Sequence, residues 1–222
     1  MRNKRLVIAI DGPSGSGKSS TAREVARRLD LSYLDTGAMY RAVAVAFLDA
    51  GVSPDDHAAV IAATTGADIE LSLEPDQTWV RVNGRDVTAQ IREPRTARHV
   101  SAVSTLPECR ADLVRRQRAL MDADPRGVVA EGRDITTVVY PDADLRILLT
   151  ASPEVRLARR GGEMAGRLDA AQLRDQVLRR DADDSRLVDF HRAAEGVRLL
   201  DTSDLTFDEV VETIVALAKE IS

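Results

Sequence analysis

One segment of the chain has the residue types and spacing that bind a polyphosphate. Residues 12–19 read Gly-Pro-Ser-Gly-Ser-Gly-Lys-Ser, a full match to the P-loop pattern GxxxxGK[ST]. The segment follows an apolar run, 6–10, and precedes a helix-like stretch, 19–29. A strand, a glycine loop and a helix in this order direct backbone N–H groups and a helix N-terminus at phosphate. The sequence therefore predicts a nucleoside triphosphate site made by Gly12, Pro13, Ser14, Gly15, Ser16, Gly17, Lys18, Ser19 and Ser20.

Two side chains of this loop have separate chemical roles. Lys18 is expected to reach the terminal phosphates, and the Ser19 hydroxyl is expected to ligate Mg²⁺. Only three of the 31 basic residues are lysines, so arginine supplies nearly all of the positive charge. A lysine at this position indicates a need for a compact ammonium group. A flexible Gly/Ser loop is the structural alternative, and the flanking strand and helix argue against it.

Composition limits the class of protein. The 222 residues are 44% apolar and 30% charged, and the net charge of −5 gives no sign of a nucleic-acid or anionic-membrane surface. A single cysteine, Cys109, excludes an internal disulfide and fits a reducing compartment. No apolar run approaches the length of a membrane span or of a signal-peptide core. We therefore expect a soluble cytoplasmic protein that binds neither nucleic acid nor membrane.

The arrangement of apolar segments predicts the fold. Short continuous apolar runs recur between helical stretches, as a parallel sheet buried on both faces requires. This alternation predicts an α/β fold with a doubly wound five-stranded parallel sheet. The predicted strands are 6–10, 32–34, 128–130, 145–150 and 197–200, and the predicted helices between and after them are 107–121, 153–160, 170–183 and 207–221.

Residues 67–91 break this pattern. The segments 67–73 and 78–82 alternate partly between apolar and polar residues, and Asn83-Gly84 is a strong hairpin signal. They predict a small antiparallel sheet inserted into the core, together with flanking helices at 38–50 and 54–65. The segment 156–166 is rich in Arg and Gly, which is typical of a short cationic lid.

Three further segments narrow the class of P-loop protein. They are Asp35-Thr36-Gly37-Ala38-Met39-Tyr40-Arg41, Glu131-Gly132-Arg133-Asp134 at the end of a predicted core strand, and Arg179-Arg180-Asp181-Ala182-Asp183-Asp184-Ser185. With the P-loop, the VSAVS segment 100–104 and the RRQR segment 115–118, they resemble the bacterial cytidylate kinases of the nucleoside monophosphate kinase family. The resemblance covers nearly the whole chain.

The resemblance implies a fold division and a reaction. It implies a monomer that transfers a phosphoryl group from ATP to CMP and dCMP. The core, including the P-loop, would consist of 1–37, 98–155 and 169–222, with the acceptor-binding insertion at 38–97 and the lid at 156–168.

The resemblance also implies roles for individual residues. The catalytic group would be Lys18, Arg41, Arg133 and Arg159, with Arg41 and Arg133 clamping the CMP phosphate. The residues implied to bind CMP are Thr36, Arg41, Ser101, Arg110, Arg133, Asp134, Arg180 and Asp184. Ser101, Arg110 and Asp134 would read cytosine, because a carboxylate can accept from its amine and a guanidinium can donate to its ring acceptors. Arg180 and Asp184 would lie near the sugar and phosphate.

Some roles stay open. At most one or two of the lid arginines Arg156, Arg159 and Arg160 need act directly, because helical spacing puts the others on different faces. Glu131 could hold Mg²⁺ through water or be structural. The chain lacks the family's Pro-Leu after Asp184-Ser185, so its last substrate-facing arginine is either a displaced Arg186 or missing.

Other functions fit parts of the sequence. The same scaffold could phosphorylate UMP, AMP or a non-nucleotide acceptor, although the inserted sheet and the Arg110/Asp134 pair argue against this. A GTP-binding switch usually reads guanine with an Asn-Lys-x-Asp segment. The one Asn-Lys here, Asn3-Lys4, precedes the P-loop and has Leu6 where Asp is needed.

Overall fold

The computed structural model of the chain describes residues 5–163 and 192–221. A large sheet contains β1 (Leu6–Asp11), β2 (Ser32–Asp35), β6 (Gly127–Gly132), β7 (Leu145–Thr150) and β8 (Arg198–Asp201). The helices are α1 (Lys18–Leu29), α2 (Thr36–Asp49), α3 (His57–Gly66), α4 (Pro94–His99), α5 (Ser101–Ser104), α6 (Pro107–Ala123), α7 (Pro153–Glu163) and α9 (Phe207–Ile221). Two short turns of helix, η1 (Gln90–Arg92) and the π-helical η2 (Ile135–Val139), complete the core and its insertion.

The large sheet confirms the predicted doubly wound α/β fold. Its strand order is β2-β6-β1-β7-β8, and every neighbouring pair is parallel. The register places Asp11 opposite Gly132, and Asp35 opposite Glu131. The P-loop and the segment that follows β6 therefore leave the sheet side by side at the carboxyl ends of their strands, where open α/β sheets bind ligands.

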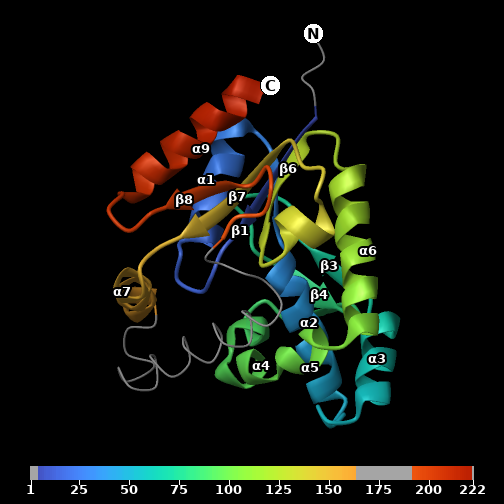
Figure 1. The fold of residues 1–222 in the computed structure, drawn as a ribbon. Coiled ribbons are helices and arrows are strands. Elements are labelled where there is room, and N and C mark those ends of the chain that lie inside the picture. Colours follow the sequence, from blue (N-terminus) through green and yellow to red (C-terminus); the bar gives the residue numbers. More distant parts are fainter. Residues whose placement is uncertain (1–4, 164–191, 222) are drawn as a thin grey trace.

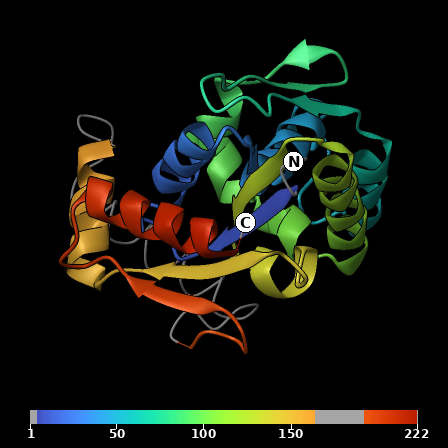
Figure 2. The ribbon, with the colours of Figure 1, turned by 90° about the horizontal axis from the view of Figure 1, so that it is seen from above.

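Helices cover both faces of the sheet (Figure 1). Alternate residues of β1 point to opposite faces, so Leu6, Ile8 and Ile10 pack with α1 and α9, whereas Val7 and Ala9 pack with α2, α3 and α6. The view along the layers in Figure 2 shows α9 and α6 on opposite sides of the strands. This two-faced burial explains why the strands read as continuous apolar runs.

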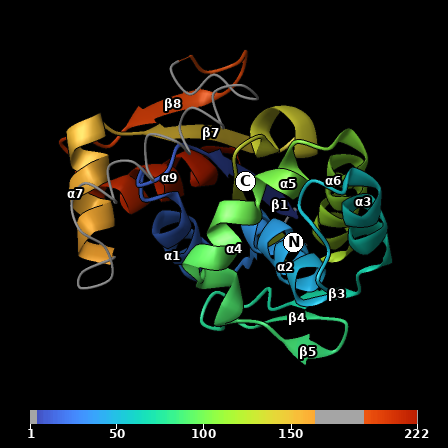
Figure 3. The same ribbon diagram turned by 90° about the horizontal axis from the view of Figure 1, so that it is seen from below.

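The predicted inserted sheet is also confirmed. It consists of β3 (Ile69–Leu71), β4 (Val80–Val82) and β5 (Arg85–Asp86), all antiparallel. Asn83 and Gly84 make the β4–β5 turn with φ values of 51° and 73°, the left-handed region that Asn-Gly turns favour. Figure 3 shows this sheet on the opposite side of the molecule from β8. A hydrogen bond from the Tyr33 amide to the Leu73 carbonyl connects β2 of the large sheet to the segment that follows β3.

Some boundaries differ from the sequence prediction. The helix predicted over 153–160 extends further and ends at Glu163 as α7. Arg156 and Arg159 both lie inside this regular helix. The turn η2, directly after the Arg133-Asp134 segment, is not foreseen by the sequence pattern. The helix predicted over 170–183 lies outside the described residues. Within the two described ranges, no helix combines the length and apolar character needed to cross a membrane.

Candidate active site

The P-loop joins β1 to α1 at the carboxyl edge of the sheet. Gly15 and Gly17 have φ values of 79° and 85°, so the loop turns through conformations that other residues rarely adopt. A Cβ atom at Gly15 would lie 2.7 Å from the Arg156 carbonyl oxygen, which shows how closely α7 approaches the loop. Gly17 is the N-cap of α1, and Lys18 begins that helix. The backbone N–H groups of the first turn of α1 therefore point toward the loop.

Lys18 and Ser19 both face a buried carboxylate. The Ser19 hydroxyl donates to Glu131 Oε1 at 2.7 Å, and the Lys18 ammonium lies 4.0 Å from Glu131 Oε2. Burial raises the pKa of Glu131, with a further rise from Asp35, while Lys18 and Ser19 act in the opposite direction. The arrangement brings a cation, a hydroxyl and a carboxylate together. Hydroxyl and carboxylate oxygens are ligands of the type that Mg²⁺ accepts beside phosphate oxygens.

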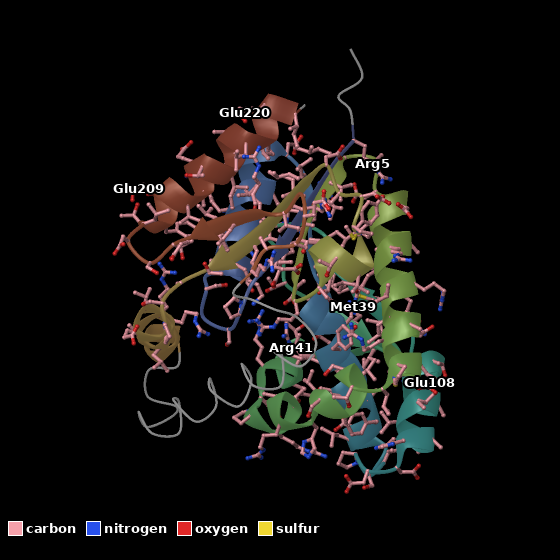
Figure 4. All side chains as sticks on the ribbon, viewed as in Figure 1. Arg5, Met39, Arg41, Glu108, Glu209 and Glu220 are labelled. Carbon is pink, nitrogen blue, oxygen red and sulfur yellow. The ribbon has the colours of Figure 1, made fainter. Side chains whose placement is uncertain are left out.

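The second predicted segment forms the start of α2. The Asp35 carboxylate accepts from the Ala38 amide at 2.9 Å and thereby caps the helix. It also accepts from Arg41 at 2.8 Å, which holds the guanidinium beside the edge of the sheet. The Thr36 hydroxyl donates to the Glu131 carbonyl at 2.8 Å. Figure 4 shows Arg41 near the middle of the molecule, far from Glu209 and Glu220 on α9.

The segment after β6 reaches back to the P-loop. The Arg133 guanidinium donates a hydrogen bond to the Gly12 carbonyl. The Arg110 guanidinium of α6 donates to Asp134 Oδ2 at 2.5 Å. The structure thus brings Arg133 to the loop and pairs the two charged side chains that the family resemblance assigns to the base.

Two neighbours complete the surroundings of this pair. Burial raises the pKa of Tyr40 to about 12, and the negative charge of Asp134 adds to the rise, so the phenol stays protonated. Ser101 lies at the exposed start of α5. Among the described residues, its hydroxyl makes no hydrogen bond to Arg110 or Asp134. Ser101 is therefore the one described member of the expected base-reading group that the structure does not connect to the other two.

Helix α7 lies beside the P-loop, as Figure 1 shows. The Arg156 guanidinium donates to the Ser14 carbonyl at 3.1 Å. The Arg159 guanidinium donates to Thr202 Oγ1 and to the Thr202 carbonyl, both at 2.8 Å, and to the Ser16 carbonyl at 3.4 Å. Arg159 is thus held between the end of β8 and the loop. Arg180, Asp184 and Arg186 lie outside the described residues, as does the second half of the predicted lid.

Sequence reasoning missed three residues of the site and left a fourth, Glu131, open. The sequence motif assigns no role to Asp35, although an aspartate just before a helix is a standard N-cap signal. Asp11 is the last residue of the buried strand β1, and Thr202 directly follows β8. A polar side chain at the carboxyl end of a parallel strand is the signal that could have identified all four.

Comparisons with known proteins agree with this geometry. The family model described as "Cytidylate kinase" matches residues 8–220. A curated cytidylate kinase of Cutibacterium acnes is 47% identical, with 98% of this chain and 97% of that protein covered. A cytidylate kinase of Streptomyces avermitilis is 46% identical, with 97% of this chain and 93% of that protein covered. A bifunctional pantoate ligase/cytidylate kinase of Synechocystis is 45% identical over 98% of this chain and 44% of its own length.

A solved structure supports the fold. An uncharacterized protein from Eubacterium ventriosum is 9% identical with a TM-score of 0.51, and the match covers 97% of this chain and 99% of that one. At this identity the likeness concerns the fold alone. The family model and the curated relatives extend over nearly the full chain, and both agree with the P-loop and the acceptor segments that meet at the sheet edge. The chain belongs to the cytidylate kinase family.

Proposed function

We propose that the chain transfers the γ-phosphoryl group of Mg²⁺-bound ATP to CMP and dCMP, giving CDP and dCDP. One observation carries the proposal. The Arg133 side chain, from the acceptor segment, donates to the Gly12 carbonyl of the P-loop. An arginine that can bind the acceptor phosphate is thereby placed against the loop that binds the donor. Phosphoryl transfer depends on such positioning and on neutralising charge, more than on acid–base chemistry.

The P-loop supplies the donor side. Backbone N–H groups from Gly15 to Ser19 and the start of α1 receive the ATP phosphates. The buried Ser16 hydroxyl has no hydrogen-bond partner among the described residues, which fits a loop that a polyphosphate completes. Ser19 would hold Mg²⁺ together with the phosphates, and Glu131, which accepts from Ser19, would orient it. The ion supplies charge neutralisation between the phosphates when bound.

Lys18 and the acceptor arginines bring the reacting groups together. Lys18 reaches the terminal phosphate from the start of α1, and its ammonium lies 4.0 Å from the Glu131 carboxylate that accepts from Ser19. Arg41 and Arg133 bind the CMP phosphate dianion and screen its repulsion from ATP. Asp35, which accepts from Arg41 at 2.8 Å, directs that guanidinium. The proposed reaction needs no strong general base among these residues.

Arg110, Asp134 and Ser101 read the base. On the cytosine edge the exocyclic amine and the N3 acceptor are neighbouring groups bonded to the same carbon, so their protein partners must also lie next to each other. The Arg110 and Asp134 side chains meet this requirement, because they lie within hydrogen-bond distance of each other. Arg180 and Asp184 hold the sugar side, and Arg159 of α7 neutralises charge on the transferred group. A monomeric state and a cytoplasmic location remain predictions.

A coupled assay of ADP release tests the function. The purified chain is given Mg·ATP with CMP, dCMP, UMP, AMP or no acceptor. We expect rapid ADP release with CMP and dCMP, slow release with UMP and AMP, and almost none without an acceptor. Direct detection of CDP separates transfer from ATP hydrolysis. Equal rates with and without CMP would contradict the proposed kinase activity.

A further inference from the structure

Asp11, the last residue of β1, joins the P-loop strand to the segment that follows β6. Its Oδ1 accepts from the Ile135 amide at 2.8 Å. Its Oδ2 accepts from the Thr136 amide at 2.8 Å and from the Thr136 hydroxyl at 2.6 Å. Both donor residues belong to the first turn of η2, directly after Arg133 and Asp134. The carboxylate therefore fixes the turn that directly follows the two acceptor-site residues.

The type of residue matters at this position. Asp11 is 1% exposed, so water cannot replace a missing hydrogen bond. All three protein groups facing the carboxylate are donors, which only an acceptor on both oxygens can satisfy. An asparagine of equal size would turn its NH₂ group toward at least one backbone N–H. The turn would then have to move, or a buried donor would be left unpaired.

The other end of η2 is held from α6. The Arg118 guanidinium donates to the Val138 and Val139 carbonyls, both at 2.7 Å. Its neighbour Arg116 in the same RRQR segment makes the same kind of contact elsewhere, with the Ala67 and Thr65 carbonyls at the end of α3. Substitution of Arg118 therefore removes a contact with η2, whereas substitution of Arg116 removes the same kind of contact away from η2 and can serve as its control.

We propose that Asp11 is a positioning residue that sets Arg133 against the P-loop and Asp134 beside Arg110 by holding the first turn of η2. The proposal rests on the proposed transfer to CMP. It follows from the geometry of one edge. Asp11 precedes Gly12, and Arg133, two residues before Ile135, donates to the Gly12 carbonyl. Two sets of hydrogen bonds therefore connect the donor loop to the acceptor segment. The Asp11 carboxylate accepts from the residues after Asp134, and the Arg133 guanidinium donates to the loop.

The test compares Asp11→Asn with Asp144→Asn at about pH 8. Asp144 is the matched control because its carboxylate also accepts a backbone amide, in this case that of Val7 at 2.9 Å, at the opposite end of β1. For Asp11→Asn we expect kcat/KM for CMP to fall by about tenfold to a hundredfold, with a raised KM for CMP and a smaller CMP:UMP preference. The KM for ATP should stay near the wild-type value. Asp144→Asn should keep both the KM for CMP and the CMP:UMP preference.

Partial unfolding has a different signature. It would lower kcat for CMP and UMP by the same factor and leave both KM values unchanged. That result for Asp11→Asn, or an equal rise of the CMP KM in Asp144→Asn, would overturn the proposal. If Asp11→Asn does not fold, Thr136→Val and Arg118→Met decide by the same criteria, with Arg116→Met as the control. A wild-type enzyme that fails to phosphorylate CMP would instead refute the proposed function.

Discussion

The guanidinium of Arg110 and the carboxylate of Asp134 are hydrogen-bonded to each other at 2.5 Å. The pair is largely shielded from water, with side-chain exposures of 22% and 10%. In this ion pair the charge of each group compensates that of the other. A base that complements both groups can replace this contact, whereas a base that complements neither leaves two partly buried charges mismatched.

This relationship leads to a prediction about base selectivity. Uracil replaces the amine of cytosine by a carbonyl and the N3 acceptor by an N–H donor. The wild-type enzyme should therefore prefer CMP over UMP by about 10²–10⁴-fold in kcat/KM. Asp134→Asn should narrow this preference, because an amide can turn its NH₂ group toward the uracil carbonyl. Steady-state kinetics with both nucleotides on both proteins measures the change.

Asp112→Asn is the control for that experiment. Asp112 pairs with Arg116 at 2.6 Å on the same helix as Arg110, but away from Asp134. It should keep the wild-type preference for CMP. If the wild-type enzyme uses UMP and CMP equally well, the assignment of Arg110 and Asp134 to the base is wrong, even if phosphoryl transfer occurs.

Most of the fold could be predicted, because burial on both faces leaves a direct mark on the sequence. All five strands of the large sheet were expected within a few residues of β1, β2, β6, β7 and β8. Asn83-Gly84 located the small hairpin for a local reason, the positive φ that both residues accept. The turn η2 was not predictable, since its shape depends on Asp11 and Arg118, which are far away in sequence.

The site was predictable in its motifs but not in its internal contacts. The P-loop pattern identified Lys18 and Ser19, but no spacing rule shows that Glu131 faces both of them. The end of α7 could not be placed, because two glycines at 161 and 162 suggest that a helix stops while the structure continues it. The contact between Arg159 and Thr202 joins residues that are distant in sequence, and only the fold brings them together.

Lys18→Ala should reduce kcat by about a hundredfold or more, because a charge aimed at the transferred group is lost. It should also change the pH dependence of stability. Burial already raises the pKa of Glu131, and removal of Lys18 raises it further. The folded state then holds a proton that the unfolded state has lost. The variant should therefore lose more stability, relative to the wild type, at about pH 8 than at about pH 5.

Urea unfolding at the two pH values, together with the transfer assay, tests this prediction. Lys219→Ala is the matched control, since Lys219 is an exposed residue of α9. It should leave both kcat and the pH dependence unchanged. Near-normal turnover of Lys18→Ala would remove the assignment of the P-loop lysine to catalysis.

Asp11 should make its own contribution to the pH dependence of stability. Burial raises the pKa of Asp11 from 3.8 to about 6, despite the opposing hydrogen bonds from Thr136 and Ile135. Between these values the folded state binds a proton that the unfolded state releases, so the free energy of unfolding falls as the pH rises. The loss should approach about 3 kcal/mol above pH 6, at roughly 1.4 kcal/mol per pKa unit.

The Asp11→Asn variant lacks the carboxyl group that titrates in this pH range. The difference in unfolding free energy between wild type and variant should therefore change across about pH 4 to 6 and become constant above it. Subtracting the two curves cancels the other titrating groups. Two parallel curves over this range would show that the carboxyl has the same pKa in the folded and unfolded chain.

Arg159 should be the arginine of α7 whose loss most affects turnover. Its guanidinium donates two hydrogen bonds to Thr202 and one to the Ser16 carbonyl, which leads into the Lys18-Ser19 start of α1, whereas Arg156 donates to the Ser14 carbonyl earlier in the loop. An arginine that stabilises the transferring group is worth about 10³–10⁵ in rate. Arg159→Ala should therefore lower kcat far more than Arg156→Ala, and Thr202→Val should lower it moderately by releasing the guanidinium.

Arg159→Lys distinguishes charge from geometry. Lysine keeps the charge but cannot donate to both Thr202 oxygens in a planar fork, so kcat should fall between the values for wild type and Arg159→Ala. Arg28→Lys is the control, because Arg28 of α1 pairs with Glu24 of the same helix and with Glu212 of α9. All variants are measured at saturating ATP and CMP. Equal kcat for Arg159→Ala and the wild type would mean that α7 holds the P-loop in shape and that another cation stabilises the transferred group.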